Sequence, residues 1–177
     1  MLNFDVSNQE LSFHGQTSPR WRWSAEEVTE FLGNAVPLVR ELDLRIVELS
    51  PERTVGAVSA TPGALNQNGT LQASTFYILA DNAIGSAFLA GLEGYTLDPR
   101  KHPGKTVMGW LKDGYVKHIR PASGEIRAHV EITPEQRASV LAELEATGKA
   151  TCVGEARIHQ GENLVAIARH TFVFLRK

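Results

Sequence analysis

The sequence predicts an α+β domain in which an antiparallel sheet wraps around one long central helix. The first observation is residues 71–92, where 14 of 22 residues are hydrophobic and cover nearly the whole circumference of a helix. The second is a series of segments in which apolar and polar residues alternate, as in half-buried strands. The third is the length of 177 residues, which suits one ordinary domain rather than two.

The composition is that of an ordinary globular chain, and it excludes several classes of protein. Hydrophobic residues make up 42% and charged residues 21%, so the chain has enough apolar surface to fold. A formal charge of −2 provides no general attraction to nucleic acid. Cys152 is the only cysteine, which excludes an internal disulfide and a cysteine metal cage and fits a reducing, cytoplasmic location.

We expect residues 1–22 to be an N-terminal extension and residues 23–177 to be the single domain. The extension lacks the pattern of charged, apolar and small residues that marks a signal peptide. The stretch 71–92 is long enough to cross a membrane. Asp81 stands at its centre, however, where a charge costs roughly 3 kcal/mol even on a lenient insertion scale. We therefore expect a helix buried in protein and no membrane association.

The N-terminal part of the domain is predicted to contain one helix and one hairpin. Ser24, followed three residues later by Glu27, forms a capping box that predicts a helix beginning there, and Pro37 ends it. The segments 42–46 and 54–58 are rich in apolar residues and are separated by a polar turn, which is typical of a strand hairpin.

The long helix is preceded and followed by loops. Residues 61–69 lead into it, and Gly91 and Gly94 can end it. Residues 95–105 show no periodicity and are expected to form a loop.

Strands predominate in the C-terminal half. Thr133 as cap, Pro134 in the first helical position and Gln136 closing the capping box predict one short helix, which Gly148 ends. Strands are predicted at 107–119, 126–132, 151–159 and 164–175. With the first hairpin this amounts to five or six strands, mostly joined as hairpins, and therefore to an antiparallel sheet.

The segment from Asn66 to Asp81 holds the residues best suited to chemistry. The first amides of a helix lack acceptors within it and lie at its positive end, so they can hold an oxyanion or a polarised carbonyl. Gly69 allows a tight turn or the close approach of a ligand. A carboxylate inside an apolar helix is costly unless it is paired or used. The alternative is that Asp81 is a structural acid, bonded to a backbone amide or an arginine, and that Asn66 and Gly69 simply cap the helix.

These residues resemble the signature of the hot-dog-fold acyl-CoA thioesterases. The resemblance is closest to the group of the phenylacetic-acid-pathway thioesterases and one type of 4-hydroxybenzoyl-CoA thioesterase. That signature runs Asn, two residues, Gly, two residues, His-Gly-Gly, then Leu-Ala-Asp or Leu-Ala-Glu. The matching residues here are Asn66, Gly69, Gln72-Ala73-Ser74 and Leu79-Ala80-Asp81, without a gap. Residues 118–124 are similar to a later sheet segment of the family, and the order of elements matches over roughly residues 35–177.

The resemblance implies hydrolysis of an acyl-CoA thioester, with coenzyme A as part of the substrate and no further cofactor. The Ala73 amide would hold the thioester oxygen with help from Gln72 or Asn66, and Asp81 would act as general base or as nucleophile. The family has histidine where Gln72 stands, and glutamine cannot become cationic. The residues expected to bind substrate are Asn66, Gly69, Ser74, Tyr77, His118 and Arg120.

The glutamine leaves a second hypothesis open, namely a hot-dog module that binds acyl-CoA or a fatty acyl group without cleaving it. A hydro-lyase is disfavoured. The branches of the fold with that activity are expected to carry an Asp followed five residues later by a His, whereas this chain has Ser86 five residues after Asp81. The resemblance also implies a homodimer, possibly paired again into a homotetramer, in which Asn66 and Gln72 of one chain face Asp81 of the other. The histidines show no paired ligand spacing, so no metal site is expected.

Overall fold

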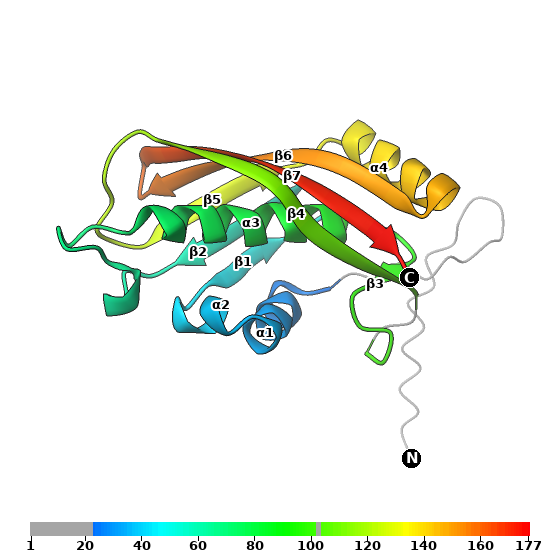
Figure 1. Cartoon of the computed structure of the whole chain (residues 1–177), viewed down its shortest axis with the longest axis horizontal. Helices are drawn as coiled ribbons and strands as arrows, with labels where there is room; N and C mark the ends of the chain where they lie inside the picture. The colour runs from blue at the N-terminus through cyan, green and yellow to red at the C-terminus, as the bar shows by residue number, and fades with distance from the viewer. Residues whose placement is uncertain (1–22, 102–103) are drawn as a thin grey trace, which may run out of the picture.

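The structure is a computed structural model that describes residues 23–101 and 104–177. The predicted N-terminal extension, residues 1–22, lies outside the described residues. Helix α3 (Ala73–Ala90) runs through the middle of the molecule, and a curled sheet wraps around it (Figure 1). The predicted α+β class, with a sheet around one long helix, is therefore confirmed.

The described part of the sheet has seven strands in the order β1-β2-β5-β6-β7-β4-β3. Neighbouring strands are antiparallel except β3 and β4, which are parallel. The prediction of a loop over 95–105 is wrong at its start, because β3 forms there from two residues that have no periodicity of their own. The strands are β1 (Arg45–Leu49), β2 (Arg53–Val58), β3 (Tyr95–Thr96), β4 (Lys105–His118), β5 (Ile126–Glu131), β6 (Lys149–Gln160) and β7 (Asn163–Arg176).

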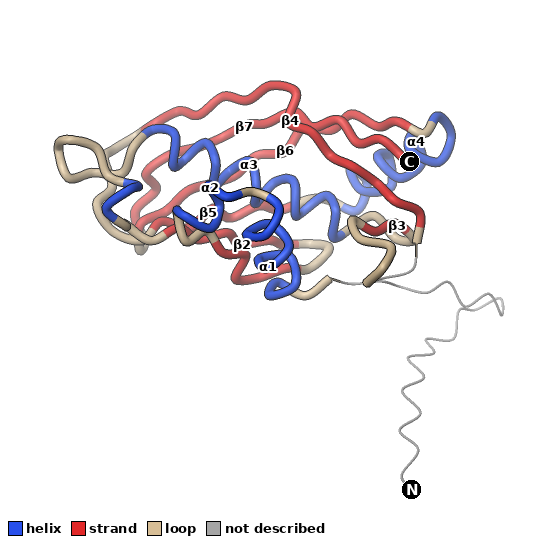
Figure 2. Tube along the Cα trace, turned by 60° about the horizontal axis from the view of Figure 1, so that its bottom comes forward, coloured by secondary structure: helices blue, strands red, loops and turns tan. Residues whose placement is uncertain are grey.

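Of three smaller α-helices, the first packs against β1, the second against the first helix, and the third against β6 and β7 (Figure 2). Both predicted capping boxes are confirmed, one at Ser24 and Glu27 and the other at Thr133 and Gln136. Pro37 ends the first helix as predicted, but it also begins a second, short helix, since proline is well tolerated in a first helical turn. The helices are α1 (Ala25–Ala35), α2 (Pro37–Glu41) and α4 (Pro134–Thr147).

Helix α3 is buried on most of its circumference, as its sequence predicts. It packs against β2, β4, β5, β6 and β7. Two glycines let strands come close to it: a Cβ at Gly56 would lie 3.0 Å from the Leu79 side chain, and one at Gly154 would lie 2.4 Å from Ile84. Across residues 23–101 and 104–177, no helix is both long enough and apolar enough to span a membrane.

The described residues leave one side of α3 and one edge of the sheet uncovered. Ser74 is exposed, and Tyr77 and Asp81 are half-buried. Strand β4 pairs with β7 along its length, but its other edge pairs within the described chain at Lys105 and Thr106 alone. No described strand pairs with the rest of that edge, and unpaired backbone groups of this kind can bind another strand. These two features define where a site and a partner can lie.

Candidate active site

Asn66 organises the loop that leads into α3. Its Oδ1 accepts hydrogen bonds from the backbone N–H groups of Asn68 at 2.9 Å and Thr70 at 3.3 Å, and its Nδ2 lies 2.9 Å from the Thr70 hydroxyl. Gly69 has a φ of +71°, a conformation that glycine adopts without steric cost. Both residues predicted to bind substrate in this loop therefore also hold its shape.

Gln72 occupies the N-cap position of α3, and its side chain turns back to the loop. Its Nε2 donates to the backbone carbonyl oxygens of Leu65 at 3.0 Å and Gly63 at 3.4 Å. Among the described residues, no side chain caps this helix end. The amides of Ala73 and Ser74 thus face neither a side-chain acceptor nor an acceptor within the helix. The Gln72 side chain therefore stabilises the loop and lies next to these amides.

An open pocket of about 340 Å³ lies at the N-terminus of α3. Its wall combines the start of the helix, the preceding loop and the chain that leaves β4. The ring of His118 stands edge-on to Phe76, with centroids 4.9 Å apart. The lining residues are Asn66, Leu71, Ala73, Phe76, His118, Ile119, Arg120 and Pro121. Four residues singled out in the sequence, Asn66, Ala73, His118 and Arg120, therefore meet in one pocket.

Asp81 lies two turns further along the same helix and does not line this pocket. Ala73, Tyr77 and Asp81 follow one another at four-residue intervals, so they share one side of α3. Eight residues separate Ala73 from Asp81, about 12 Å along the axis. Burial raises the pKa of Asp81 from 3.8 to about 6. Within residues 23–101 and 104–177, its carboxylate has no hydrogen-bond or ion-pair partner, so the arginine or backbone amide that a structural acid would need is not found.

A buried histidine next to Tyr77, on the side of α3 that carries Asp81, was not predicted from the sequence. The His170 imidazole on β7 is fully buried and packs on the Tyr77 ring, with centroids 4.6 Å apart. Neither ring nitrogen has a partner among the described residues, and burial lowers the pKa of His170 to about 4. The residues paired with it on either side, Gly114 and Gly154, have no side chains. His170 alternates in phase with the buried Phe172, and this was the signal that could have revealed it.

Arg120, Cys152 and the metal-ligating residue types were the other candidates for chemistry in the described chain. Arg120 donates from Nη1 to Asn163 at 3.3 Å and remains exposed at the pocket. Burial raises the pKa of the Cys152 thiol to about 12, so it is not a reactive thiolate at neutral pH. Across the described part of the chain, no three His, Cys, Asp or Glu residues come together as metal ligands.

Comparison with known proteins identifies the fold. No family model and no curated protein matches the sequence. A Pseudomonas aeruginosa protein of unknown function, described as a probable thioesterase, matches with a TM-score of 0.71 and 19% identity over 89% of this chain and 99% of that one. The fold is the hot-dog fold. A thioesterase from Haemophilus influenzae matches with a TM-score of 0.65 and 18% identity over 89% of this chain and 94% of its own.

A mutant thioesterase from Pseudomonas aeruginosa also shares the hot-dog fold, with a TM-score of 0.64 and 14% identity over 89% of this chain and 98% of that one. Identities this low establish architecture, and function must be argued from the site. The predicted hot-dog fold is confirmed. The narrower group to which the segment from Asn66 to Asp81 is similar stays a prediction.

Proposed function

We propose that this protein hydrolyses an acyl-CoA thioester to a free acid and coenzyme A. The observation that carries the proposal is the Asp81 carboxylate, half-buried on an apolar helix with no partner in the described chain. A pKa of about 6 leaves it ionised at neutral pH yet more basic than an ordinary aspartate. A base of this kind on the same helix as a free N-terminal amide suits acyl transfer to water.

The chemistry follows from these two groups. The Ala73 N–H, at the positive end of α3, would polarise the thioester carbonyl and stabilise the oxyanion that forms there. Asp81 would take a proton from water as the water oxygen bonds to the carbonyl carbon. The C–S bond then breaks, and the proton held by Asp81 passes to the departing coenzyme A sulfur. The alternative is direct attack by Asp81 to form a mixed anhydride, which water then opens.

The phosphates of coenzyme A would lie at the open pocket. Arg120 is exposed there, and its guanidinium keeps further N–H donors beyond the one given to Asn163. His118 and the Asn66 loop would border the thioester from the other sides. No further cofactor takes part in this scheme.

The site would be completed by two chains. Reacting groups must come within about 3–3.5 Å, and one helix holds Ala73 and Asp81 about 12 Å apart along its axis. We propose a homodimer, possibly paired again into a tetramer, in which Asp81 of the partner subunit faces the Ala73 amide. The open edge of β4 supports this, with Trp110 and Tyr115 exposed by 45% and 65%.

A complementation experiment tests the two-chain site. Ala73→Pro removes the proposed N–H donor at the first helical position, where proline is tolerated, and Asp81→Asn removes the base. Each variant alone should be inactive. Subunit exchange between them should restore about a quarter of wild-type activity, because half of the dimers then carry one intact site. An inactive mixture of exchanged dimers, or a fully active monomer in sedimentation, would contradict the two-chain site.

The activity itself is tested with a panel of straight-chain, arylacetyl and hydroxybenzoyl CoA esters and a free-thiol readout. Asp81→Asn should lower turnover at least about a hundredfold. Glu145→Gln is the matched control, since it makes the same change at a carboxylate far along the chain. Near-normal turnover by folded Asp81→Asn would remove Asp81 from the mechanism. Binding of the esters without turnover by the wild type would favour the non-catalytic acyl-CoA module instead.

A further inference from the structure

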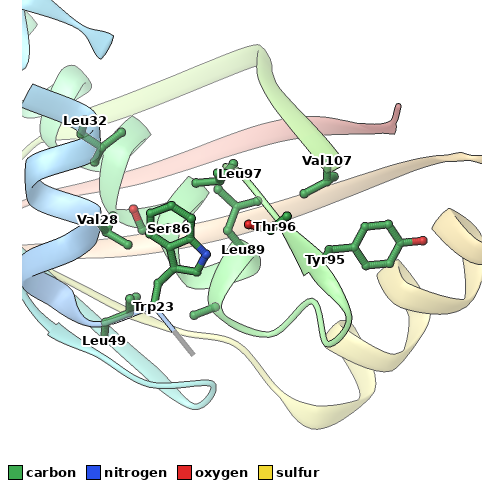
Figure 3. A pocket seen from close by; sticks show the side chains of 11 residues that line it. Trp23, Val28, Leu32, Leu49, Ser86, Leu89, Tyr95, Thr96, Leu97 and Val107 are labelled. Atoms are coloured by element: carbon green, nitrogen blue, oxygen red, sulfur yellow. The ribbon is translucent and has the colours of Figure 1, made fainter. Parts of the chain in front are cut away.

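A second cavity lies at the other end of α3, between that helix, α1 and the start of β4. Figure 3 shows the Trp23 ring over its centre, with aliphatic side chains around it. Trp23 itself is held edge-on against Phe31, with ring centroids 5.7 Å apart. Its lining includes Trp23, Val28, Leu32, Ser86, Leu89 and Val107.

The cavity is small and apolar. Its volume of about 30 Å³ corresponds to roughly two water molecules. Its hydroxyl groups belong to Ser86 and Thr96, and no charged side chain lines it among the described residues. The Tyr95 hydroxyl points away, toward α4, where it donates to Glu145 at 2.6 Å (Figure 3). A cavity of this kind offers water few partners and suits methylene and methyl groups.

The cavity lies further along α3 than Asp81, toward the C-terminal end of the same helix. Asn82, next to Asp81, is half-buried, and Ser86 and Leu89 follow it at four and seven residues, so the three form one stripe. Ser86 and Leu89 lie about 7.5 and 12 Å beyond Asp81 along the helix axis. A chain that lies on this stripe with its thioester at Asp81 would place its end in the cavity.

We propose that this cavity receives the end of an unbranched aliphatic acyl group. The inference rests on the proposed function and specifies its substrates as CoA esters whose acyl group is unbranched and uncharged. The apolar wall excludes a charged or strongly polar chain end, because such a group would lose water without gaining a partner. The small volume favours the end of a linear chain over a ring, since a ring would have to push α1 away from α3. Val28 and Leu32 of α1 therefore set the chain length that fits.

Two opposite substitutions at one position test this with straight-chain CoA esters from butanoyl to palmitoyl. Val28→Phe fills the cavity and should move the preferred ester to a shorter chain, with kcat/KM falling about tenfold for each methylene excluded. Val28→Ala enlarges the cavity and should move the preference to a longer chain. Val140→Ala is the matched control, because Val28 and Val140 are 5% and 4% exposed but Val140 lies on α4. The control should leave the preference unchanged. Leu32→Phe, on the same wall at a half-buried position, replaces Val28→Phe if that variant does not fold.

A binding measurement separates failure of this inference from failure of the proposed function. Trp21→Phe combined with Trp110→Phe leaves Trp23 as the only tryptophan, so its emission reports on the cavity. Decanoic acid should shift that emission, and Val28→Phe should abolish the shift. This result in a protein that hydrolyses no ester would overturn the thioesterase proposal and leave the cavity assignment standing. Hydrolysis with an unchanged chain preference in both Val28 variants, and no Trp23 response, would overturn the cavity assignment alone.

Discussion

Asp81 and Glu145 are carboxylates in opposite circumstances. Asp81 is half-buried in the middle of α3 and has no partner in the described chain. Glu145 is exposed on α4 and accepts hydrogen bonds from Lys105 Nζ at 2.8 Å and the Tyr95 hydroxyl at 2.6 Å, with Arg176 at 3.6 Å. The pKa values shift in opposite directions. Burial raises that of Asp81 to about 6, whereas the bonds from Lys105 and then Tyr95 lower that of Glu145.

The comparison distinguishes a carboxylate whose ionised form is stabilised by the fold, Glu145, from one whose ionised form is destabilised by it, Asp81. Glu145 ties together β3, β4, α4 and β7, four elements that the chain brings to one corner. Asp81 bonds to no other element of the described chain, and its burial disfavours the ionised form. An ionisable group that is costly to the fold and lies on a helix whose N-terminus borders a pocket is a candidate for function. The following predictions test this contrast, from the largest effect to the smallest.

The pH dependence of activity should follow Asp81. A base must be deprotonated to act, so kcat/KM should rise about tenfold per pH unit below about pH 6 and level off above it. Asp81→Asn should lose between a hundredfold and ten-thousandfold of the activity at neutral pH and show no such rise. Glu145→Gln should keep the wild-type profile. Steady-state kinetics from pH 4 to 8 decides this, and a flat wild-type profile would count against Asp81 as the base.

Stability should depend on pH through Asp81 and His170 in opposite senses. The folded-state pKa of Asp81 lies above its ordinary value of 3.8, so its contribution is present below pH 3.8 and is lost as pH rises through about 6. The folded-state pKa of His170 lies below its ordinary value of 6.5, so its contribution is present above pH 6.5 and is lost as pH falls through about 4. Each shift corresponds to about 3 kcal/mol, and the two nearly cancel in the wild type.

Single substitutions should reveal the separate contributions of Asp81 and His170 to the pH dependence of stability. Relative to the wild type, the free energy of unfolding of Asp81→Asn should increase by about 3 kcal/mol between pH 4 and pH 6.5, because the opposing Asp81 slope is gone. His170→Phe should show the reverse change. Urea unfolding at fixed protein concentration measures both. Identical slopes in the two variants would show that neither group titrates as its burial indicates.

Gln72→Ala should have a moderate effect on both stability and activity. The variant loses the Nε2 donor to the carbonyls of Leu65 and Gly63, so we expect about 1 kcal/mol less stability and about tenfold lower kcat/KM. Gln67→Ala, at an exposed position in the same loop, is the control and should be nearly silent. Lower kcat with unchanged unfolding would instead indicate that Gln72 acts on the thioester oxygen.

Glu145→Gln should show the smallest effect. Its ion-pair partners Lys105 and Arg176 are exposed, so removing the charge should lower the melting temperature by a few degrees at most and leave turnover unchanged. Differential scanning calorimetry at low and high salt measures the shift, which should shrink as salt screens the ion pairs. A loss of activity comparable to that of Asp81→Asn would break the contrast between the two carboxylates.

Features that depend on nearby residues were predictable from the sequence. The capping residues Ser24 and Thr133 mark helix starts because the orphan amides they satisfy lie two or three residues away. Alternation marked strand β5, and the predominantly apolar stretch marked α3 as a helix that other elements must cover on nearly every side. The costly position of Asp81 could also be inferred, since its helical neighbours are apolar.

Features that depend on residues far apart in the chain were decided by the tertiary structure. Strand β3 exists because the chain after α3 returns beside Lys105 and Thr106, and no local period marks it. The approach of His118 and Arg120 to Ala73 follows from the curl of the sheet around α3, as does the cavity between α3 and α1. The sequence likewise did not determine whether Asp81 has a partner, because that depends on which distant strands pack near it. Local patterns determine which way a side chain points, but only the closed fold determines what it meets there.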